Sequence, residues 1–258
     1  MISAYRKAAN ISWRVGGSTG WKLAGILAEA HSLARPRPTP GRVRYTAPMN
    51  VLPSNLSHRD LYNLILNSVA PRAIAWVSTR STTGQPNLAP FSFFNCVCVD
   101  PPLLAFAAGL RPPKSTHSTN GESKDTLRNV RETREFVISI VTFDLLEPMN
   151  ITSGEYDETV NEWQLAKVTP APSRLVRPSR VRESPVSFEC RLYQILDFSP
   201  APTSSSLVIG QIVAIHLDDS NLKEGHLDRN SLDLIGRMGG IQYTRTTTRV
   251  ELARPEVG

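Results

Sequence analysis

The middle of the chain alternates between short apolar runs and stretches rich in turn residues. Residues 73–79 form one extended run, and a second run begins at Leu88 and ends at the Pro-Pro pair 101–102. The segment between them, residues 81–86, is rich in residues that favour turns. This order predicts a hairpin of two strands.

Three further segments carry strand patterns. Residues 103–108 are wholly apolar, which predicts a buried strand, whereas residues 135–142 alternate between apolar and polar positions, as a half-buried strand does. Residues 185–198 and 207–217 are long, rich in β-branched residues and separated by the turn SPAPTSSS. They predict a second hairpin that completes a barrel. Residues 168–185 lack periodicity, and we expect them to wrap the surface or a partner subunit.

Two segments carry helical patterns. Ser57 is a good N-cap with Asp60 three positions later, and Leu61, Leu64 and Ile65 share one face. We expect this helix to lie against the barrel. A short helix is also predicted over residues 145–150.

A further helix is predicted after a loop at residues 109–121. Ser123 is the expected cap, and Leu127 and Val130 have helical spacing. The amides of a first helical turn offer positive potential, to which Lys124 adds a full charge, so a phosphate could dock there. The alternative is a plain surface helix with solvated charges.

The net charge of +6 comes from one end of the chain. Residues 1–48 carry eight Lys or Arg against Glu29, a charge of +7, and the remaining residues sum to −1. A nearly neutral body argues against a nucleic-acid partner. No apolar run reaches the length that spans a bilayer, so no membrane partner is expected.

The chain therefore divides into a basic extension, residues 1–48, and a single domain, residues 49–258. The extension resembles an organelle transit peptide, which would place the protein in mitochondria. It could equally be a disordered segment, or sequence ahead of a true start at Met49. The GGSTG sequence around Ser18 fits a hydrolase nucleophile motif, but fifteen preceding residues cannot build the parallel sheet that such a motif requires.

Three cysteines without a secretory signal indicate a reducing compartment, and we expect the cytoplasm. Cys96 and Cys98 are interpreted as small buried residues rather than redox or metal groups, and Cys190 as part of the core. The histidines have no metal-ligand spacing with cysteines, so no metal site is predicted. His216 is expected to be structural.

Polar side chains are unusually frequent in the first predicted hairpin. Because strands place neighbouring residues close together, several hydrogen-bond donors should lie near one another, which suits a planar ligand with a polar edge. These residues are Arg72, Ser78, Thr79, Asn87, Ser92 and Asn95.

The amino-acid sequences of this hairpin and of three later segments resemble those of a known family. PRAIAWVST, NLAPFSFFN and DPP are followed by KDT at residues 124–126, MNITS at 149–153 and a closing Arg, Gly pair and Tyr at 237–243. In this order they are similar to the flavoredoxin-like branch of the flavin reductase-like proteins. The resemblance covers about residues 56–243 and implies a mainly β fold, a Greek-key split β-barrel of the FMN-binding type with a few short peripheral α-helices.

The resemblance also implies roles for these residues, while no catalytic residue is predicted. The residues expected to anchor the phosphate and polar edge of FMN are Arg72, Ser78, Thr79, Lys124, Asp125 and Thr126. Those expected around the flavin ring are Asn87, Ser92 and Asn95. Those expected nearby, where glycines would let the backbone approach the ring, are Asn150, Ser153, Arg237 and Tyr243.

The expected function is that of an FMN-dependent oxidoreductase passing hydride or electrons between NAD(P)H and a flavin or other small acceptor. NAD(P)H would dock transiently, because the sequence has no nucleotide-binding fingerprint. The resemblance further implies a homodimer. The alternatives are a non-catalytic FMN-binding electron carrier or sensor, and a barrel whose polar residues are purely structural.

Overall fold

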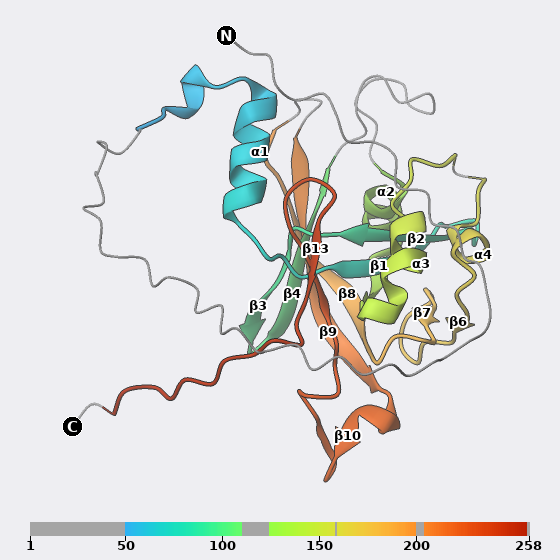
Figure 1. The fold of residues 1–258 in the computed structure, drawn as a ribbon. Helices are drawn as coiled ribbons and strands as arrows, with labels where there is room; N and C mark the ends of the chain where they lie inside the picture. Colours follow the sequence, from blue (N-terminus) through green and yellow to red (C-terminus); the bar gives the residue numbers. More distant parts are fainter. Residues whose placement is uncertain (1–49, 110–123, 158, 200–203, 257–258) are drawn as a thin grey trace, which may run out of the picture. The chain divides into compact units, whose positions relative to one another are not determined.

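The computed structural model describes residues 50–109, 124–157, 159–199 and 204–256. All thirteen predicted site residues fall within these ranges, whereas residues 1–48 and the expected cap Ser123 lie outside them. At the centre is a seven-stranded antiparallel sheet in the order β2-β1-β5-β8-β9-β4-β3 (Figure 1). Its strands are β1 (Ala75–Arg80), β2 (Pro86–Phe91), β3 (Phe94–Val99), β4 (Pro102–Gly109), β5 (Glu135–Ile140), β8 (Val186–Asp197) and β9 (Ser205–Leu217).

The two edge strands of this sheet are consecutive in the chain. Only Ser92 and Phe93 separate β2 from β3, and three peptide steps cover at most about 11 Å. In a flat seven-stranded sheet the edges would be roughly 29 Å apart. The sheet must therefore curl until its edges meet at this corner, which confirms the predicted mainly β barrel.

Both predicted hairpins are confirmed. Strand β1 pairs with β2, with Thr79 opposite Asn87, and β8 pairs with β9, with Val186 opposite Leu217. The run that begins at Leu88 is not one strand, because it bends at Ser92 to pass from one edge of the sheet to the other.

Short helices and small strand pairs surround the sheet. The helices are α1 (His58–Ser68), α2 (Asp125–Thr133), α3 (Leu146–Ile151) and α4 (Glu162–Ala166), with 3-10 turns at Pro53–Asn55, Phe143–Leu145 and Asp219–Asn221. The small strand pairs are β6 (Pro170–Ala171) with β7 (Arg180–Val181), β10 (Leu222–Lys223) with β11 (His226–Leu227), and β12 (Ile235–Arg237) with β13 (Tyr243–Arg245).

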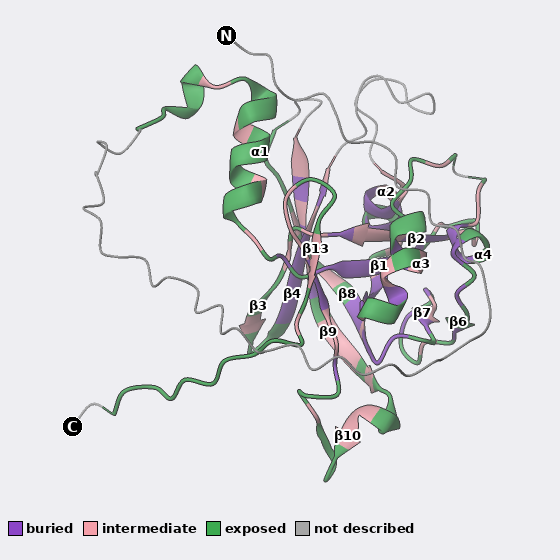
Figure 2. Cartoon of the chain, viewed as in Figure 1, coloured by how far each residue is buried: buried purple, intermediate pink, exposed green. Residues whose placement is uncertain are grey.

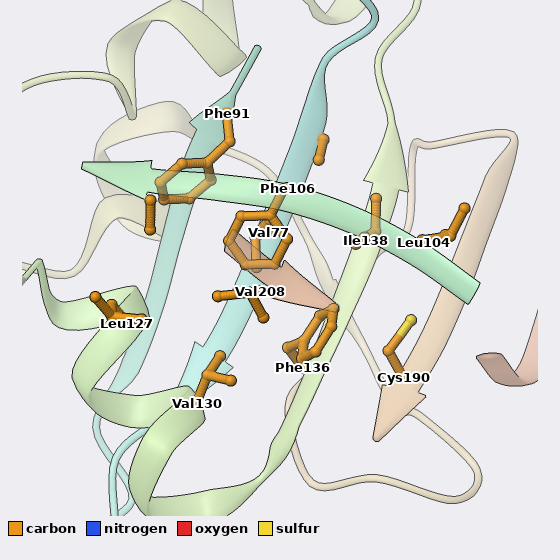
Figure 3. Packing of buried hydrophobic residues seen from close by; sticks show 12 residues of the cluster. Val77, Phe91, Leu104, Phe106, Leu127, Val130, Phe136, Ile138, Cys190 and Val208 are labelled. Atoms are coloured by element: carbon orange, nitrogen blue, oxygen red, sulfur yellow. The ribbon is translucent and has the colours of Figure 1, made fainter. Parts of the chain in front are cut away.

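The two faces of β1 belong to two separate hydrophobic cores, because successive side chains of a strand point to opposite faces. Ala75 and Val77 pack in the first core with residues of β4, β5 and α2, as Figure 3 shows around Phe106 and Leu127. Ile74 and Trp76 pack in the second core, whose other members include residues of α3, α4 and β7. In Figure 2 strand β1 is accordingly among the most buried parts of the chain.

Helix α1 begins as predicted but does not bury its apolar face. Ser57 Oγ accepts a hydrogen bond from the amide of Asp60 at 3.1 Å. However, no residue of the helix is buried, and Leu64 and Ile65 are 51% and 47% exposed (Figure 2). The expectation that this face lies against the barrel is therefore wrong. The reason is that the helix is held through backbone carbonyls at its C-terminal end, described below, rather than by apolar packing.

Residues 168–185 do not simply wrap the surface. They form the β6–β7 pair, and Ala171, Val176 and Val181 within them are buried. The amide of Val181 donates to Ser139 Oγ on β5 at 3.2 Å. This segment therefore closes the second core.

Candidate functional site

A small cavity lies at the edge strand β2, where that strand meets the start of α2 and the chain after α3. It encloses about 60 Å³. It is lined by Asn87, Ala89, Pro90 and Phe91 of β2, by Lys124, Asp125 and Thr126, by Thr152, Ser153, Gly154, Glu155 and Tyr156, and by Glu162 of α4. We call it the β2-edge cavity.

A buried hydrogen-bond network fixes the start of α2 at this cavity. Asn87 Nδ2 donates to Thr126 Oγ1 at 2.9 Å and to Thr79 Oγ1 at 3.1 Å. Asn129 Nδ2 also donates to Thr79 Oγ1, at 3.1 Å. All four side chains are buried. Strands β1 and β2 therefore hold the N-terminal turn of α2 in one position.

The N-terminus of α2 carries positive potential into the cavity. Lys124 is the N-cap residue and makes no side-chain capping hydrogen bond, so the helix does not use a side chain of its own there. The first amides of a helix and the end of its dipole favour an anion, and the Lys124 ammonium group adds a charge. This end of the cavity is suited to a phosphate.

The remaining charged groups are acidic. Asp125, Glu155 and Glu162 line the same cavity. The carboxylate of Asp125 lies 2.7 Å from the guanidinium of Arg128, one turn further along α2. Carboxylates accept hydrogen bonds from hydroxyl and N–H groups, so the site combines an anion-binding end with several acceptors.

The wall after α3 is fixed by its own hydrogen bonds. Thr152 Oγ1 accepts from Trp76 Nε1 at 2.9 Å and donates to the carbonyl of Met149 at 2.8 Å. Ser153 Oγ donates to the carbonyl of Asn150 at 2.7 Å, and Tyr156 Oη to that of Ile151 at 2.8 Å. These bonds give the cavity a preformed wall where the chain leaves α3.

A second group of predicted residues comes together beside α3. Tyr243 Oη donates to Asn150 Oδ1 at 3.3 Å, and the guanidinium of Arg237 lies 4.5 Å from the centre of the Tyr243 ring. Two glycines of this segment lie close to the protein's own chain. A Cβ on Gly236 would lie 2.8 Å from Pro71 Cβ, and one on Gly239 1.6 Å from Asn67 Oδ1, so both permit packing against the protein's own chain.

Arg72 lies outside the β2-edge cavity. Its guanidinium donates to the carbonyls of Leu66, at 2.7 Å, and Val69 at the end of α1, and to that of Met238 at 2.9 Å. Burial, and secondarily the charge of Arg237, lower the pKa of Arg72. Arg72 therefore ties α1 to residue 238 and is not among the residues that line the cavity.

The other hairpin residues are spread over the sheet. Ser78 and Thr79 border a different cavity, considered below. Ser92 is half-buried at the corner between β2 and β3, and Asn95 is exposed, with its Oδ1 accepting from the amide of Cys96 at 2.8 Å. Of the six polar residues predicted in the hairpin, Asn87 lines the β2-edge cavity, together with Lys124, Asp125, Thr126 and Ser153.

Four lining residues with polar side chains were missed by the sequence reasoning, namely Thr152, Glu155, Tyr156 and Glu162. Glu162 carries no motif, since α4 reaches β2 only through the fold. Thr152 lies within the MNITS segment at residues 149–153 but was not singled out as a site residue. Tyr156 lies three residues beyond the MNITS segment, which was the one available signal.

The cysteines are only partly as predicted. Cys190 is in the core, but Cys96 is exposed and Cys98 half-buried, so the interpretation of these two as buried residues is wrong. They lie on β3, an edge strand with an irregular register between them. Within the described residues there is no cluster of three or more potential metal ligands, and no helix there is both long and apolar enough to cross a bilayer.

Comparisons with known proteins point in one direction. The model of the "Flavin reductase like domain" family matches residues 67–233. An uncharacterised protein of Aquifex aeolicus is 38% identical over 72% of this chain and 89% of its own length.

Solved structures are also similar. Nitrilotriacetate monooxygenase component B from Bacillus cereus has a TM-score of 0.73 and 29% identity, covering 80% of this chain and 99% of its own. The 2-nitrobenzoate 2-nitroreductase of Pseudomonas fluorescens has a TM-score of 0.69 and 32% identity, covering 80% and 96%. A flavin reductase from Shewanella frigidimarina described as having a split barrel domain (TM-score 0.66, 22% identity, 81% and 100% covered) shares the fold.

Proposed function

This chain belongs to the flavin reductase-like domain family, and we propose that it is an FMN-dependent oxidoreductase passing hydride or electrons between NAD(P)H and a flavin or other small acceptor. The observation that carries the proposal is the β2-edge cavity, where Asn87 and Thr126 hold Lys124 and the start of α2 in place. A flavin-related oxidoreductase role agrees with the neighbours, one a monooxygenase component and one a nitroreductase.

The donors and acceptors of the cavity fit a flavin mononucleotide chemically. The phosphate would bind Lys124 and the first amides of α2, because both favour an anion. Asn87, Ser153 and Glu155 offer the mixture of donors and acceptors that a ribityl chain and the polar edge of a flavin require.

A bound flavin supplies the hydride and electron chemistry itself. The protein residues would bind and orient it. The β2 side chains Ala89, Pro90 and Phe91 give the cavity an apolar wall that excludes water, while Lys124 fixes the phosphate end. Asn150, Arg237 and Tyr243 form the neighbouring polar group, which we propose contacts the flavin from the side of α3.

The size of the cavity supports a second subunit at the site. At about 60 Å³ it is far below the roughly 300–1,000 Å³ of pockets that enclose ligands of this kind. The β2-edge cavity by itself therefore encloses only part of a flavin. We propose a homodimer in which a second copy covers the rest. Apolar side chains are available for such contact, including Leu64 and Ile65 of α1 and Val97 and Val99 of β3, all exposed.

The proposed location remains the cytoplasm. It rests on the free cysteines, two of which are not buried, because exposed thiols persist in reducing compartments. The Aquifex relative is bacterial, and nothing in the comparisons supports a mitochondrial transit peptide.

One experiment separates the enzyme from a flavin carrier. The purified full chain is reconstituted with FMN, its absorbance is recorded, and NADH and NADPH are added separately under anaerobic conditions. If the protein is an oxidoreductase, the flavin absorbance at roughly 450 nm falls after NADH or NADPH is added. Flavin binding without any reduction indicates a carrier or sensor. Failure to bind flavin at all contradicts the proposal.

A further inference from the structure

A second cavity lies beside strand β1 and shares no lining residue with the β2-edge cavity. It encloses about 180 Å³. Its lining comprises Ser78, Thr79 and Arg80 of β1, Pro86 of β2, Asn161 and Trp163 at α4, and Pro170, Pro178 and Ser179 of the β6–β7 segment. We call it the β1–α4 cavity.

Two buried donors of this cavity have no hydrogen-bond partner among the described residues. They are Ser78 Oγ and Trp163 Nε1, in side chains that are 1% and 4% exposed. By contrast, the buried indole donor of Trp76 has a partner, because its Nε1 donates to Thr152 Oγ1. A buried donor without a partner costs about 1–3 kcal/mol, so a binding partner that accepts from both would be favoured.

Both donors are held in place by secondary structure. Ser78 lies on β1, where it pairs with Leu88 of β2 on one side and with Val137 of β5 on the other. Trp163 is in the first turn of α4, where the cap residue Asn161 accepts from its amide at 3.1 Å. The donors are therefore preorganised, which reduces the entropy lost on binding.

The far wall is fixed by a buried carboxylate. The amides of Arg174, Leu175 and Val176 donate to Glu189 at 2.6, 2.6 and 3.2 Å. These residues precede Pro178 and Ser179 of the cavity wall. The loop that contributes the wall is thus anchored to β8.

We propose that the β1–α4 cavity binds a small planar neutral molecule that carries a carbonyl oxygen, with Ser78 and Trp163 donating to that oxygen. Three proline rings and the indole give apolar walls, and a cavity of about 150 Å³ is known to hold benzene, so a single ring fits. The one charged lining residue, Arg80, is exposed and its Nε donates to the carbonyl of Gly84 at 2.8 Å, so no buried charge calls for an ion. The site lies outside the proposed flavin cavity, and it assigns Ser78 to a ligand other than FMN.

Acetophenone is a suitable probe because it is a single ring with a carbonyl acceptor. The full chain, labelled with ¹⁵N at its tryptophans, is titrated with acetophenone and followed by the indole N–H resonances. The Trp163 resonance, assigned with Trp163→Phe, should shift saturably, while the hydrogen-bonded Trp76 resonance stays in place. Ethylbenzene, with the same carbon skeleton and no acceptor, should bind more weakly.

Calorimetry then tests the donors. Ser78→Ala and Trp163→Phe should each weaken acetophenone binding about fivefold to tenfold, the loss expected for one hydrogen bond. The matched control is Ser187→Ala, whose buried hydroxyl pairs with Ser139 outside the cavity. It should leave the affinity unchanged. Thermal unfolding verifies that each variant is folded. The proposal is overturned if acetophenone does not bind saturably and only ordered water occupies the cavity. It is also overturned if both donor variants bind acetophenone as tightly as the parent protein does.

Discussion

The imidazole of His216 and the carboxylate of Glu189 form one contact across β8 and β9, with Nε2 and Oε1 2.5 Å apart. Glu189 has no exposed surface, and its remaining acceptor capacity is taken by three backbone amides of residues 174–176. Burial raises the pKa of Glu189, but the bonds from Arg174, His216 and Leu175 outweigh it and leave the pKa below its ordinary value. The carboxylate is therefore ionised and holds the β6–β7 segment in place.

This geometry predicts how stability depends on pH. Because the pKa of Glu189 is lower in the folded than in the unfolded chain, the folded state binds fewer protons. Its stabilising contribution is complete above the unfolded value of about 4.3 and is lost as the pH falls through the folded value. Glu189→Gln should lower the free energy of unfolding at pH 7 by roughly 3 kcal/mol and flatten the decline in acid.

Urea unfolding at a series of pH values measures both effects. Glu183→Gln is the control, because Glu183 accepts from the amide of Thr169 at 3.0 Å but is exposed. It should change stability by less than 1 kcal/mol or so. A Glu189→Gln variant as stable as the parent at pH 7 would show that the buried carboxylate does not hold this segment.

The strands were predictable from sequence because their pattern is local. The two-residue period of β1 assigns Trp76 and Ser78 to one face and Val77 and Thr79 to the other, and the two cores respect that assignment. The same period separates Ser78 from Thr79, yet both residues border the β1–α4 cavity, so the period alone does not decide whether they serve one ligand.

The site was predictable where a motif is local and not where the fold brings segments together. Lys124, Asp125 and Thr126 are consecutive, and they do line the β2-edge cavity. The use of Arg72 was not visible, because its partners are carbonyls of α1 and of residue 238. A guanidinium that bonds carbonyls looks the same in a sequence as one that bonds phosphate.

The cysteines should differ sharply in reactivity. Cys96 and Cys98 lie on the edge strand β3 and are exposed and half-buried, whereas Cys190 is wholly buried. Burial, with a smaller effect from the charge of Glu189, raises the pKa of the Cys190 thiol, which keeps it protonated. An Ellman titration of the native protein at pH 8 should therefore detect two thiols, and three after denaturation. Cys190→Ala should leave the native count at two; a native count of three would contradict the burial of Cys190.

Lys124 should contribute strongly to flavin affinity. If its ammonium group bonds the phosphate, Lys124→Ala should weaken FMN binding by roughly 1.5 to 3 kcal/mol. Riboflavin, which lacks the phosphate, should lose little affinity in the same variant. Flavin fluorescence quenching measures both, with Lys223→Ala as the control because Lys223 is exposed on β10, outside the cavity. Unchanged FMN affinity in Lys124→Ala would remove Lys124 from the site.

Arg72 allows the structural and the ligand-binding interpretations to be separated. Its guanidinium serves the carbonyls of Leu66, Val69 and Met238, so Arg72→Met should leave these acceptors without a donor and release α1. We expect the free energy of unfolding to fall by about 2 kcal/mol, with FMN affinity unchanged. Urea unfolding and flavin titration give the two readouts. Arg59→Met, an exposed substitution on α1, should alter neither. The opposite result would be full stability with FMN affinity reduced as far as in Lys124→Ala. It would mean that Arg72 contacts the phosphate, because removing a guanidinium that binds the carbonyls of α1 must also destabilise that helix.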